Sequence, residues 1–226
     1  MFTLRLPEFH SLPRLALAAA FTVLACSLMY YLPQHWHVGS PSLLPFTLVD
    51  EALPFWPLSG LVYFAMFAFL AGTFVSLHSF DGATRFLYAT LLAQAIGMAV
   101  FMLWPTVYPR EAFALPVDAG PLATALVKFC READQPVNCF PSLHVSTVAI
   151  CLATLWHRSS AASGAVPRLL GLLAGLAMIV STLTFKQHYL LDVVAGAVLG
   201  CVSWWLCFRW RGLLLVRPGQ RTKPGG

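Results

Sequence analysis

The chain has 226 residues, of which 58% are hydrophobic and only 10% are charged, with a formal net charge of +5. Soluble globular domains carry about 25% charged residues. The composition therefore excludes an ordinary soluble domain, and the scattered basic residues show no patterned face that would bind nucleic acid. Apolar runs long enough to cross a bilayer indicate an all-α polytopic membrane protein, with residues 1–226 forming one domain.

Six apolar runs predict six transmembrane helices, because a helix needs roughly 20 residues to cross the bilayer. In chain order they are Leu15–Leu32, Phe55–Leu77, Phe86–Trp104, Pro141–Trp156, Arg168–Phe185 and Tyr189–Phe208. The fourth run is short, and we expect it to take extra length from its loops. The first could be read as a secretion signal, since Val23–Ser27 resembles a lipoprotein cleavage box. Its apolar run continues past Cys26, however, which favours an uncleaved helix.

The basic residues predict which side each loop faces, since Lys and Arg mark the cytoplasmic side of short loops. Ten of the fourteen fall on one side, at Arg5, Arg14, Arg85, Arg158, Arg168, Arg209, Arg211, Arg217, Arg221 and Lys223. The other four are Arg110, Lys128, Arg131 and Lys186. We therefore expect cytoplasmic tails at residues 1–14 and 210–226. The loops Gln34–Pro54, Pro105–Phe140 and Lys186–His188 then face outward, from a bacterial inner membrane.

The six cysteines fall into two groups. Four lie within predicted helices, where cysteine usually acts as a small apolar residue; they are Cys26, Cys151, Cys201 and Cys207. Cys130 and Cys139 lie in the outward loop, on the oxidising side of a plasma membrane. A disulfide between these two is one interpretation, and two free thiols is the other. The spacing contains no CxxC pair, so it predicts no structural zinc site.

Ionisable side chains gather in three segments at the outward side: Leu103–Glu111, Asn138–Ser146 and Ser181–Val193. In the last segment His188 and Asp192 are four residues apart, so on a helix they share a face. A carboxylate there can accept a hydrogen bond from one ring nitrogen, which leaves the other nitrogen nucleophilic. Taken alone, this segment is equally compatible with a structural His–Asp pair.

The three segments together also supply groups that suit a phosphate. Pro141 and Ser142 indicate a helix start, whose free N–H groups bind anions, and His144 lies one turn into that helix. Arg110 and Lys186 are cations at about the same depth. The structural alternatives are a core histidine, an arginine anchor and a snorkelling lysine. Ionisable residues at membrane depth are functional candidates, so the groups together predict a phosphate-handling site.

These segments resemble the type 2 phosphatidic acid phosphatase superfamily of membrane lipid phosphatases and phosphotransferases. FPSLHVS and KQHYLLDVVAG look most like the branch that includes inositol phosphorylceramide synthase-like proteins, as does the segment Val49–Tyr63. The resemblance covers the chain from about Asp50 to Gly200. It implies a six-helix fold, an outward active site and no metal or cofactor.

The resemblance also implies a role for each matching residue. His188 matches the nucleophile, Asp192 its orienting partner and His144 the general acid. The phosphate-binding positions of the family fall on Ser142 and Arg110.

Three positions depart from the usual motifs of the family. The lysine expected seven residues before the arginine is Leu103, and Leu143 replaces the glycine of Pro-Ser-Gly-His. Ser181-Thr182 stands where Ser-Arg is usual. Lys186 is then the candidate substitute for a missing phosphate-binding cation.

The leading interpretation is an integral-membrane phosphatase of lipid phosphomonoesters or pyrophosphates, acting through a phosphohistidine at His188. An acceptor alcohol could intercept the same intermediate, which would make the protein a lipid phosphotransferase. Metal-assisted hydrolysis is disfavoured because Arg110 and Lys186 would repel a cation. A non-enzymatic transporter or assembly factor is disfavoured because the ionisable groups lie at the ends of the predicted helices. The expected partner is a phosphorylated lipid, whose identity the residues leave open.

Overall fold

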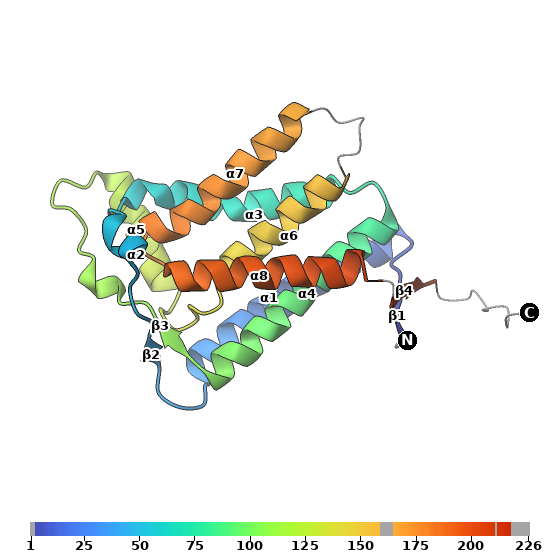
Figure 1. Cartoon of the computed structure of the whole chain (residues 1–226), viewed down its shortest axis with the longest axis horizontal. Helices are drawn as coiled ribbons and strands as arrows, with labels where there is room; N and C mark the ends of the chain where they lie inside the picture. The colour runs from blue at the N-terminus through green and yellow to red at the C-terminus, as the bar shows by residue number, and fades with distance from the viewer. Residues whose placement is uncertain (1–2, 159–164, 211, 218–226) are drawn as a thin grey trace, which may run out of the picture.

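The computed structural model describes residues 3–158, 165–210 and 212–217. Helices dominate these ranges and form an elongated bundle (Figure 1). The α-helices are α1 (Leu12–His35), α2 (Leu48–Ala52), α3 (Gly60–Val75), α4 (Phe80–Leu103), α5 (Pro121–Ala133), α6 (Leu143–Arg158), α7 (Ala165–Thr184) and α8 (Leu190–Phe208). Two short 3₁₀ helices are η1 (Pro57–Ser59) and η2 (Arg110–Ala112).

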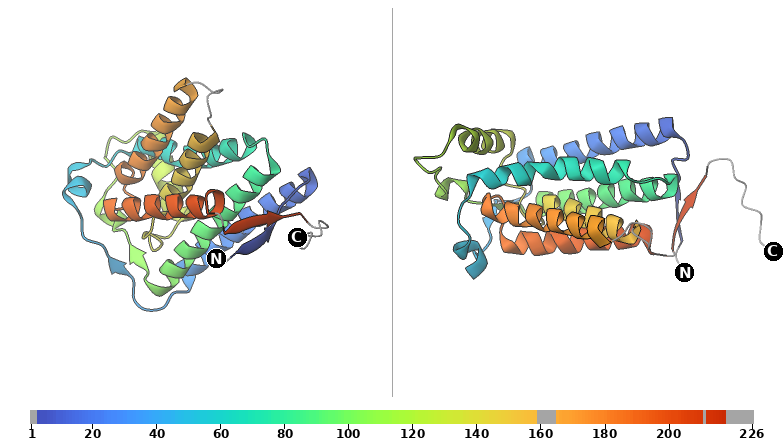
Figure 2. Two further views of the ribbon diagram at one scale, coloured as in Figure 1. Left: turned by 45° about the vertical axis from the view of Figure 1, so that its right-hand side comes forward. Right: turned by 90° about the horizontal axis from the view of Figure 1, so that it is seen from above.

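Five helices in the described ranges are long and apolar enough to cross a membrane, judged by length and composition. They cover Leu12–His35, Pro57–Val75, Phe80–Leu103, Val166–Thr184 and Leu190–Phe208. The fourth predicted span is α6, which has only 16 residues. At 1.5 Å per residue α6 is about 24 Å long, shorter than the roughly 30 Å hydrocarbon core. It contacts α3, α4, α7 and α8, so this shorter helix lies among the others (Figure 2).

The two terminal segments, expected as simple tails, pair with each other. β1 (Leu4–Pro7) and β4 (Leu213–Val216) form a parallel two-stranded sheet at the end of the bundle where the described chain begins and finishes (Figure 1). Beside this sheet, Arg217 Nε donates a hydrogen bond to Glu8 Oε2 at 2.8 Å. The short sheet is a departure from a purely helical fold, and it brings the first and last described strands to one end of the bundle.

The opposite end is covered by α2, α5 and a second parallel strand pair, β2 (Ser42–Leu43) and β3 (Thr106–Val107) (Figure 1). Helix α5 lies inside the segment that the sequence analysis treated as a loop. It begins at a proline, which suits the first helical position, and it buries Ala123, Val127 and Cys130 along one face. Amphipathic helices of this kind lack the long apolar run that marks a membrane span.

Gly196 and Gly200 let α8 approach the backbone of α6. A Cβ atom at Gly196 would meet the carbonyl oxygen of Ser142, and one at Gly200 would meet that of Ser146. Small residues four apart permit such close contact between membrane helices. Ser142 N also donates a hydrogen bond to the backbone oxygen of Asp192 at 3.1 Å. The N-termini of α6 and α8 are therefore held side by side.

Candidate functional site

His188 and Asp192 meet at the start of α8, as the spacing predicts, but through different local geometry. The helix begins at Leu190, so His188 precedes it and does not share its face. Asp192 Oδ2 accepts hydrogen bonds from His188 Nδ1 and from the backbone N–H of Tyr189, both at 3.0 Å. A side chain at the third helical position often folds back in this way to cap the helix. The same Asp192 oxygen thus caps α8 and orients the His188 ring.

The start of α6 holds the second histidine. The helix begins directly after Ser142, and Ser142 Oγ accepts a hydrogen bond from Val145 N at 3.3 Å. This contact agrees with the predicted serine cap. His144, in the first turn, places Nδ1 3.3 Å from His188 Nε2. The two predicted histidines are therefore in direct contact, although 44 residues separate them in the sequence.

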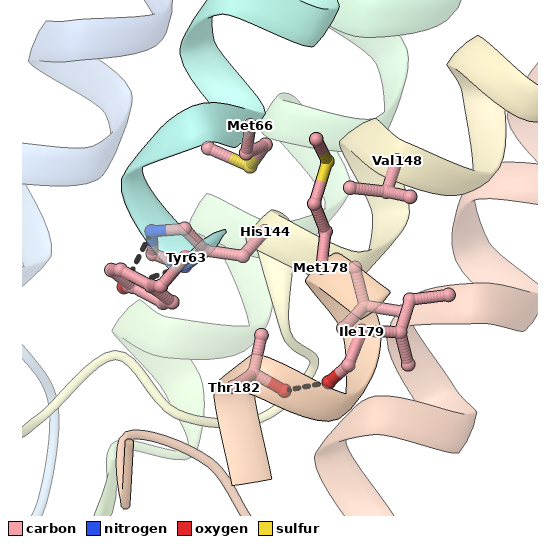
Figure 3. A pocket seen from close by; sticks show the side chains of 8 residues that line it. Tyr63, Met66, His144, Val148, Met178, Ile179 and Thr182 are labelled. Atoms are coloured by element: carbon pink, nitrogen blue, oxygen red, sulfur yellow. Dashed lines mark hydrogen bonds between the residues drawn. The ribbon is translucent and has the colours of Figure 1, made fainter. Parts of the chain in front are cut away.

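Tyr63 extends this row of side chains from the other side of His144. Its hydroxyl oxygen lies 2.6 Å from His144 Nε2, and the two ring centroids are 4.5 Å apart (Figure 3). Tyr63 comes from the first turn of α3 and is buried. It lies at the end of the Val49–Tyr63 segment that resembles the family, but no sequence motif gives it a role. Asp192, His188, His144 and Tyr63 now form one continuous hydrogen-bonded row.

A narrow apolar pocket borders this row between α3, α6 and α7 (Figure 3). Met66, Val148 and Met178 line it beside the His144 ring. Thr182, which replaces the arginine usual in the family, also lines the pocket, and its hydroxyl donates to Ile179 O at 2.7 Å. The position of the missing arginine therefore borders His144 but carries no charge.

Arg110, a predicted phosphate-binding residue, is buried in an ion pair that the sequence analysis did not foresee. Its Nη2 lies 2.7 Å from Asp134 Oδ2, and Nη1 donates to Asp134 O at 2.7 Å. Burial disfavours the charged guanidinium, but the Asp134 carboxylate outweighs that effect and raises the Arg110 pKa above its usual value. Arg110 Nε has no hydrogen-bond partner among the described residues. It is therefore a buried donor that the described part of the chain leaves unpaired.

Arg110 also connects to the histidine row electrostatically. Its guanidinium interacts with both Tyr63 and His144. Asp134, which ends α5, also accepts a hydrogen bond from the Tyr30 hydroxyl at 2.8 Å. Residues from α1, η2 and α5 therefore hold the arginine beside the histidines. No short sequence pattern joins these elements, so Asp134 could not have been found by motif.

Lys186 is buried and its ammonium group is engaged by backbone carbonyls. Nζ donates to Asp50 O at 2.9 Å and to Leu53 O at 2.7 Å, at the end of α2. It also lies 4.9 Å from the centroid of the Phe113 ring. Burial lowers the Lys186 pKa below its usual value, while the charge of Asp50 works in the opposite direction. Two of the three ammonium hydrogens are used by these carbonyls.

Asp50 is a further buried carboxylate that the sequence analysis did not single out. Its Oδ1 accepts a hydrogen bond from Leu190 N at 2.8 Å, at the start of α8. Its Oδ2 accepts from Thr47 N at 2.8 Å, at the start of α2. Asp50 and Lys186 thus attach α2 to the turn that carries His188. The Val49–Tyr63 segment that resembles the family was the available signal.

The two other departures from the family motifs, Leu143 and Leu103, lie in different surroundings. Leu143, in place of glycine, packs over Gly97 of α4, where a Cβ atom would collide with the Leu143 side chain. Leu103, in place of lysine, has 73% of its surface exposed at the end of α4. The first substitution thus fills a space left by a glycine, and the second lies on the surface.

In the structure Cys130 and Cys139 are both free thiols, the second of the two interpretations considered. Cys130 packs with Tyr63 and Phe185, and its thiol donates to Gln187 Oε1 at 3.4 Å. Cys139 belongs to a different cluster around Tyr108. Burial raises the pKa of Cys130 to about 11. Helix α5 and the loop before α6 thus place the two thiols in separate apolar clusters.

The described residues contain no group of three or more His, Cys, Asp or Glu side chains arranged to hold a metal ion. The arrangement instead offers an imidazole nitrogen oriented by a carboxylate, a second imidazole beside it, and two buried cations. A capped helix start lies next to them, where backbone N–H groups attract anions. Such a set suits nucleophilic attack on an anionic group.

Comparison with curated protein sequences finds no match. Among solved structures, the chain is similar to the crystal structure of Aquifex aeolicus LpxE, with a TM-score of 0.46 and 15% sequence identity. That similarity covers 83% of this chain and 96% of the other. A family model described as the PAP2 superfamily matches residues 59–206, from the start of α3 into the end of α8. This range contains the histidine row and both cations, and the chain belongs to the PAP2 superfamily.

Proposed function

We propose that the protein is an integral-membrane phosphatase of lipid phosphate esters that works through a phosphohistidine at His188. Membership of the PAP2 superfamily supports a phosphatase of this substrate class. The observation that carries the proposal is that each ring nitrogen of His188 has its own partner. Its Nδ1 faces Asp192 at 3.0 Å and its Nε2 faces His144 at 3.3 Å. With the proton held on Nδ1, the lone pair of Nε2 points toward the reacting group.

In the first step His188 Nε2 attacks the phosphorus, and the phosphoryl group separates the two imidazoles. A P–N bond forms while the bond to the lipid oxygen breaks. That oxygen keeps the bonding electron pair and takes a proton from His144. In the second step, water loses a proton to the now neutral His144 and attacks the phosphorus. The P–N bond then breaks and inorganic phosphate leaves.

Phosphate binding is proposed for Arg110, Ser142 and Lys186. Arg110 Nε, which lacks a partner among the described residues, supports a direct role for that side chain. The start of α6 can add the backbone N–H groups of Leu143 and His144. Those of Ser142 and Val145 already donate within the protein. Lys186 would act with its remaining hydrogen and its charge, since two of its donors already serve Asp50 and Leu53. Charge that develops on the equatorial oxygens is stabilised by such donors.

The site is proposed to face outward, away from the cytoplasm. The histidines lie at the end of the bundle opposite the β1–β4 sheet. The described basic residues on the β1–β4 side include Arg5, Arg14, Arg85 and Arg217, which favours a cytoplasmic location for that end. In a bacterial inner membrane the active site would then open to lipid at the outer leaflet.

The test is a phosphate-release screen of the purified full chain against lipid phosphomonoesters and pyrophosphates. We expect His188→Ala to lose at least about a thousandfold in kcat, as removal of a nucleophile usually does. The matched control is His157→Ala, because His157 is exposed on α6 near the opposite end. Full activity of His188→Ala would contradict the proposal. A ³²P label on the wild type that is absent from His188→Ala would support the covalent intermediate.

Two further arms of the screen separate the alternatives. Unchanged activity in EDTA is expected, and loss that one added metal restores would replace the mechanism with metal-assisted hydrolysis. Labelled lipid incubated with inositol or a lipid alcohol tests transfer. Free phosphate in every mixture supports hydrolysis, whereas a new labelled lipid would assign the phosphotransferase activity that the inositol phosphorylceramide synthase-like segments suggest.

A further inference from the structure

The Tyr63 hydroxyl contacts both ring nitrogens of His144, and its shorter contact is with Nε2. The hydroxyl oxygen is 2.6 Å from Nε2 and 3.3 Å from Nδ1 (Figure 3). Nδ1 also lies 3.3 Å from His188 Nε2, so the short contact assigns Tyr63 to Nε2 and leaves Nδ1 to His188. The Tyr63 side chain is 4% exposed and packs against the Phe185 ring, with 5.5 Å between the centroids. Phe185 in turn lies over Gly60, whose missing side chain leaves room for its ring. The hydroxyl is therefore positioned by packing around the whole tyrosine ring.

The donors in this row can be assigned by counting hydrogens. If His188 Nδ1 donates to Asp192, then its Nε2 must accept from His144 Nδ1. A neutral His144 then has no hydrogen on Nε2, and that atom accepts from the Tyr63 hydroxyl. Every hydrogen in the row then has an acceptor, and each points in the direction from Tyr63 to Asp192.

No other described residue of the pocket can replace Tyr63 at His144 Nε2. The neighbouring pocket side chains include Met66, Val148 and Met178, which are apolar. The hydroxyl of Thr182 already donates to Ile179 O. Without the tyrosine hydroxyl, the buried Nε2 would have no partner, and the imidazole would lose the contact that sets its orientation.

We propose that Tyr63 is a positioning residue for the general acid, and that it makes Nδ1 of His144 the atom that delivers and later recovers the proton. This inference rests on the proposed phosphatase function. When His144 is protonated, Nε2–H donates and the Tyr63 hydroxyl rotates to accept, since a phenol can do both. The Nδ1–H bond then breaks as the O–H bond of the leaving alcohol forms. Tyr63 itself neither gains nor loses a proton.

The positioning role predicts that the tyrosine hydroxyl matters most when the leaving group needs a proton. A lipid alkoxide is a poor leaving group and depends on the acid, whereas p-nitrophenolate leaves without one. General acid catalysis contributes about 10²–10⁴-fold in enzymes. Loss of a residue that only orients the acid should remove part of this rate enhancement. It should leave the attack by His188 at its normal rate.

The experiment compares the wild type with Tyr63→Phe on two substrates, the fastest lipid phosphomonoester from the screen and p-nitrophenyl phosphate. We expect kcat on the lipid to fall about 10–100-fold with little change in KM, and kcat on the aryl ester to fall less than about threefold. The alkaline limb of the pH–rate profile should move to lower pH. Tyr88→Phe is the matched control, because the Tyr88 hydroxyl donates to Pro7 O at the opposite end of the bundle.

Equal losses on both substrates, or no loss on either, would overturn the inference. A readout that does not depend on turnover is the ¹⁵N spectrum of ring-labelled histidine, with the His144 signals identified by His144→Gln. Tyr63→Phe should shift the Nε2 signal of His144, and an unchanged signal would also overturn the inference. A wild type without phosphatase activity would refute the proposed function, while this spectrum would still report on the Tyr63 contact.

Discussion

The two ends of the bundle differ in how deeply their charged side chains are buried. At the site end, the side chains of Arg110, Lys186, His188 and Asp192 are all buried. At the end that carries the β1–β4 sheet, Arg85 pairs with Asp81, whose side chain is 55% exposed. Burying an ion costs several kcal/mol unless its partners are well placed. Apart from Glu8, which pairs with Arg217 beside the sheet, the buried charged side chains described here lie at the site end. Because such burial is costly, it favours that end as the candidate functional one.

The largest expected effect comes from separating the two helices that carry the histidines. Gly200→Leu would drive a side chain into the backbone of α6 at Ser146, and we expect no folded protein after detergent extraction. Gly200→Ala should cost about 1–3 kcal/mol, as for overpacking. Gly72→Leu on α3 is the matched control, because a Cβ atom there meets nothing within 4 Å. The three variants are compared by the yield of folded protein after detergent extraction and by the melting temperature of what is recovered. A normal yield and melting temperature for Gly200→Leu would refute this packing argument.

A smaller effect is expected from breaking one ion pair at each end. Asp134→Asn leaves Arg110 buried without its counter-ion and should lower the free energy of unfolding by about 3–5 kcal/mol. Asp81→Asn disrupts the more exposed pair with Arg85 and should cost less than about 1 kcal/mol. Denaturation of the two variants in the same detergent compares them directly. Similar losses of unfolding free energy in the two variants would mean that burial does not change what an ion pair contributes to stability.

The smallest of the three effects concerns Lys186. Lys186→Met keeps the length of the side chain but removes the hydrogen bonds to Asp50 O and Leu53 O. Bonds from a charged group are worth about 1.5–3 kcal/mol, so the melting temperature should fall. If Lys186 also binds phosphate, KM for the lipid should rise about tenfold, since one such bond is lost. Lys128→Met is the control, because the side chain of Lys128 is 72% exposed on α5. A lower melting temperature with unchanged KM would assign Lys186 to structure alone.

Hydropathy predicted the long helices well and their ends less well. The last helix was expected at Tyr189–Phe208 and is found at Leu190–Phe208. The third was expected to begin at Phe86 but α4 begins at Phe80, where Ser79 caps it. Apolar length reflects the thickness of a membrane, whereas a helix continues until its end groups are capped. Helix α5 was missed for a different reason, because an amphipathic helix has no long apolar run.

The site was predicted as a set of residues, but its connections were not. Two short motifs identified His144 and His188 because each places an ionisable group near a helix start. Asp134 carries no such local signal, and Tyr63 and Asp50 lie in a segment that resembles the family but gives neither of them a role. Tyr63 is 81 residues from His144, and Asp50 is 140 from Leu190. Contacts over these distances depend on helix packing, which local periodicity does not encode.

The sequence by itself determined the membrane-like composition, the long helices, the histidine and carboxylate groups, and the phosphate chemistry that they suggest. Those conclusions need only hydropathy, residue chemistry and spacing along one segment. The tertiary structure alone decided that Lys186 contacts α2, that Arg110 pairs with Asp134, and that Cys130 and Cys139 stay apart. A buried charge is stabilised by whatever polar atoms the fold brings near it. Those atoms come from elements far apart in the chain, so only the packed structure reveals them.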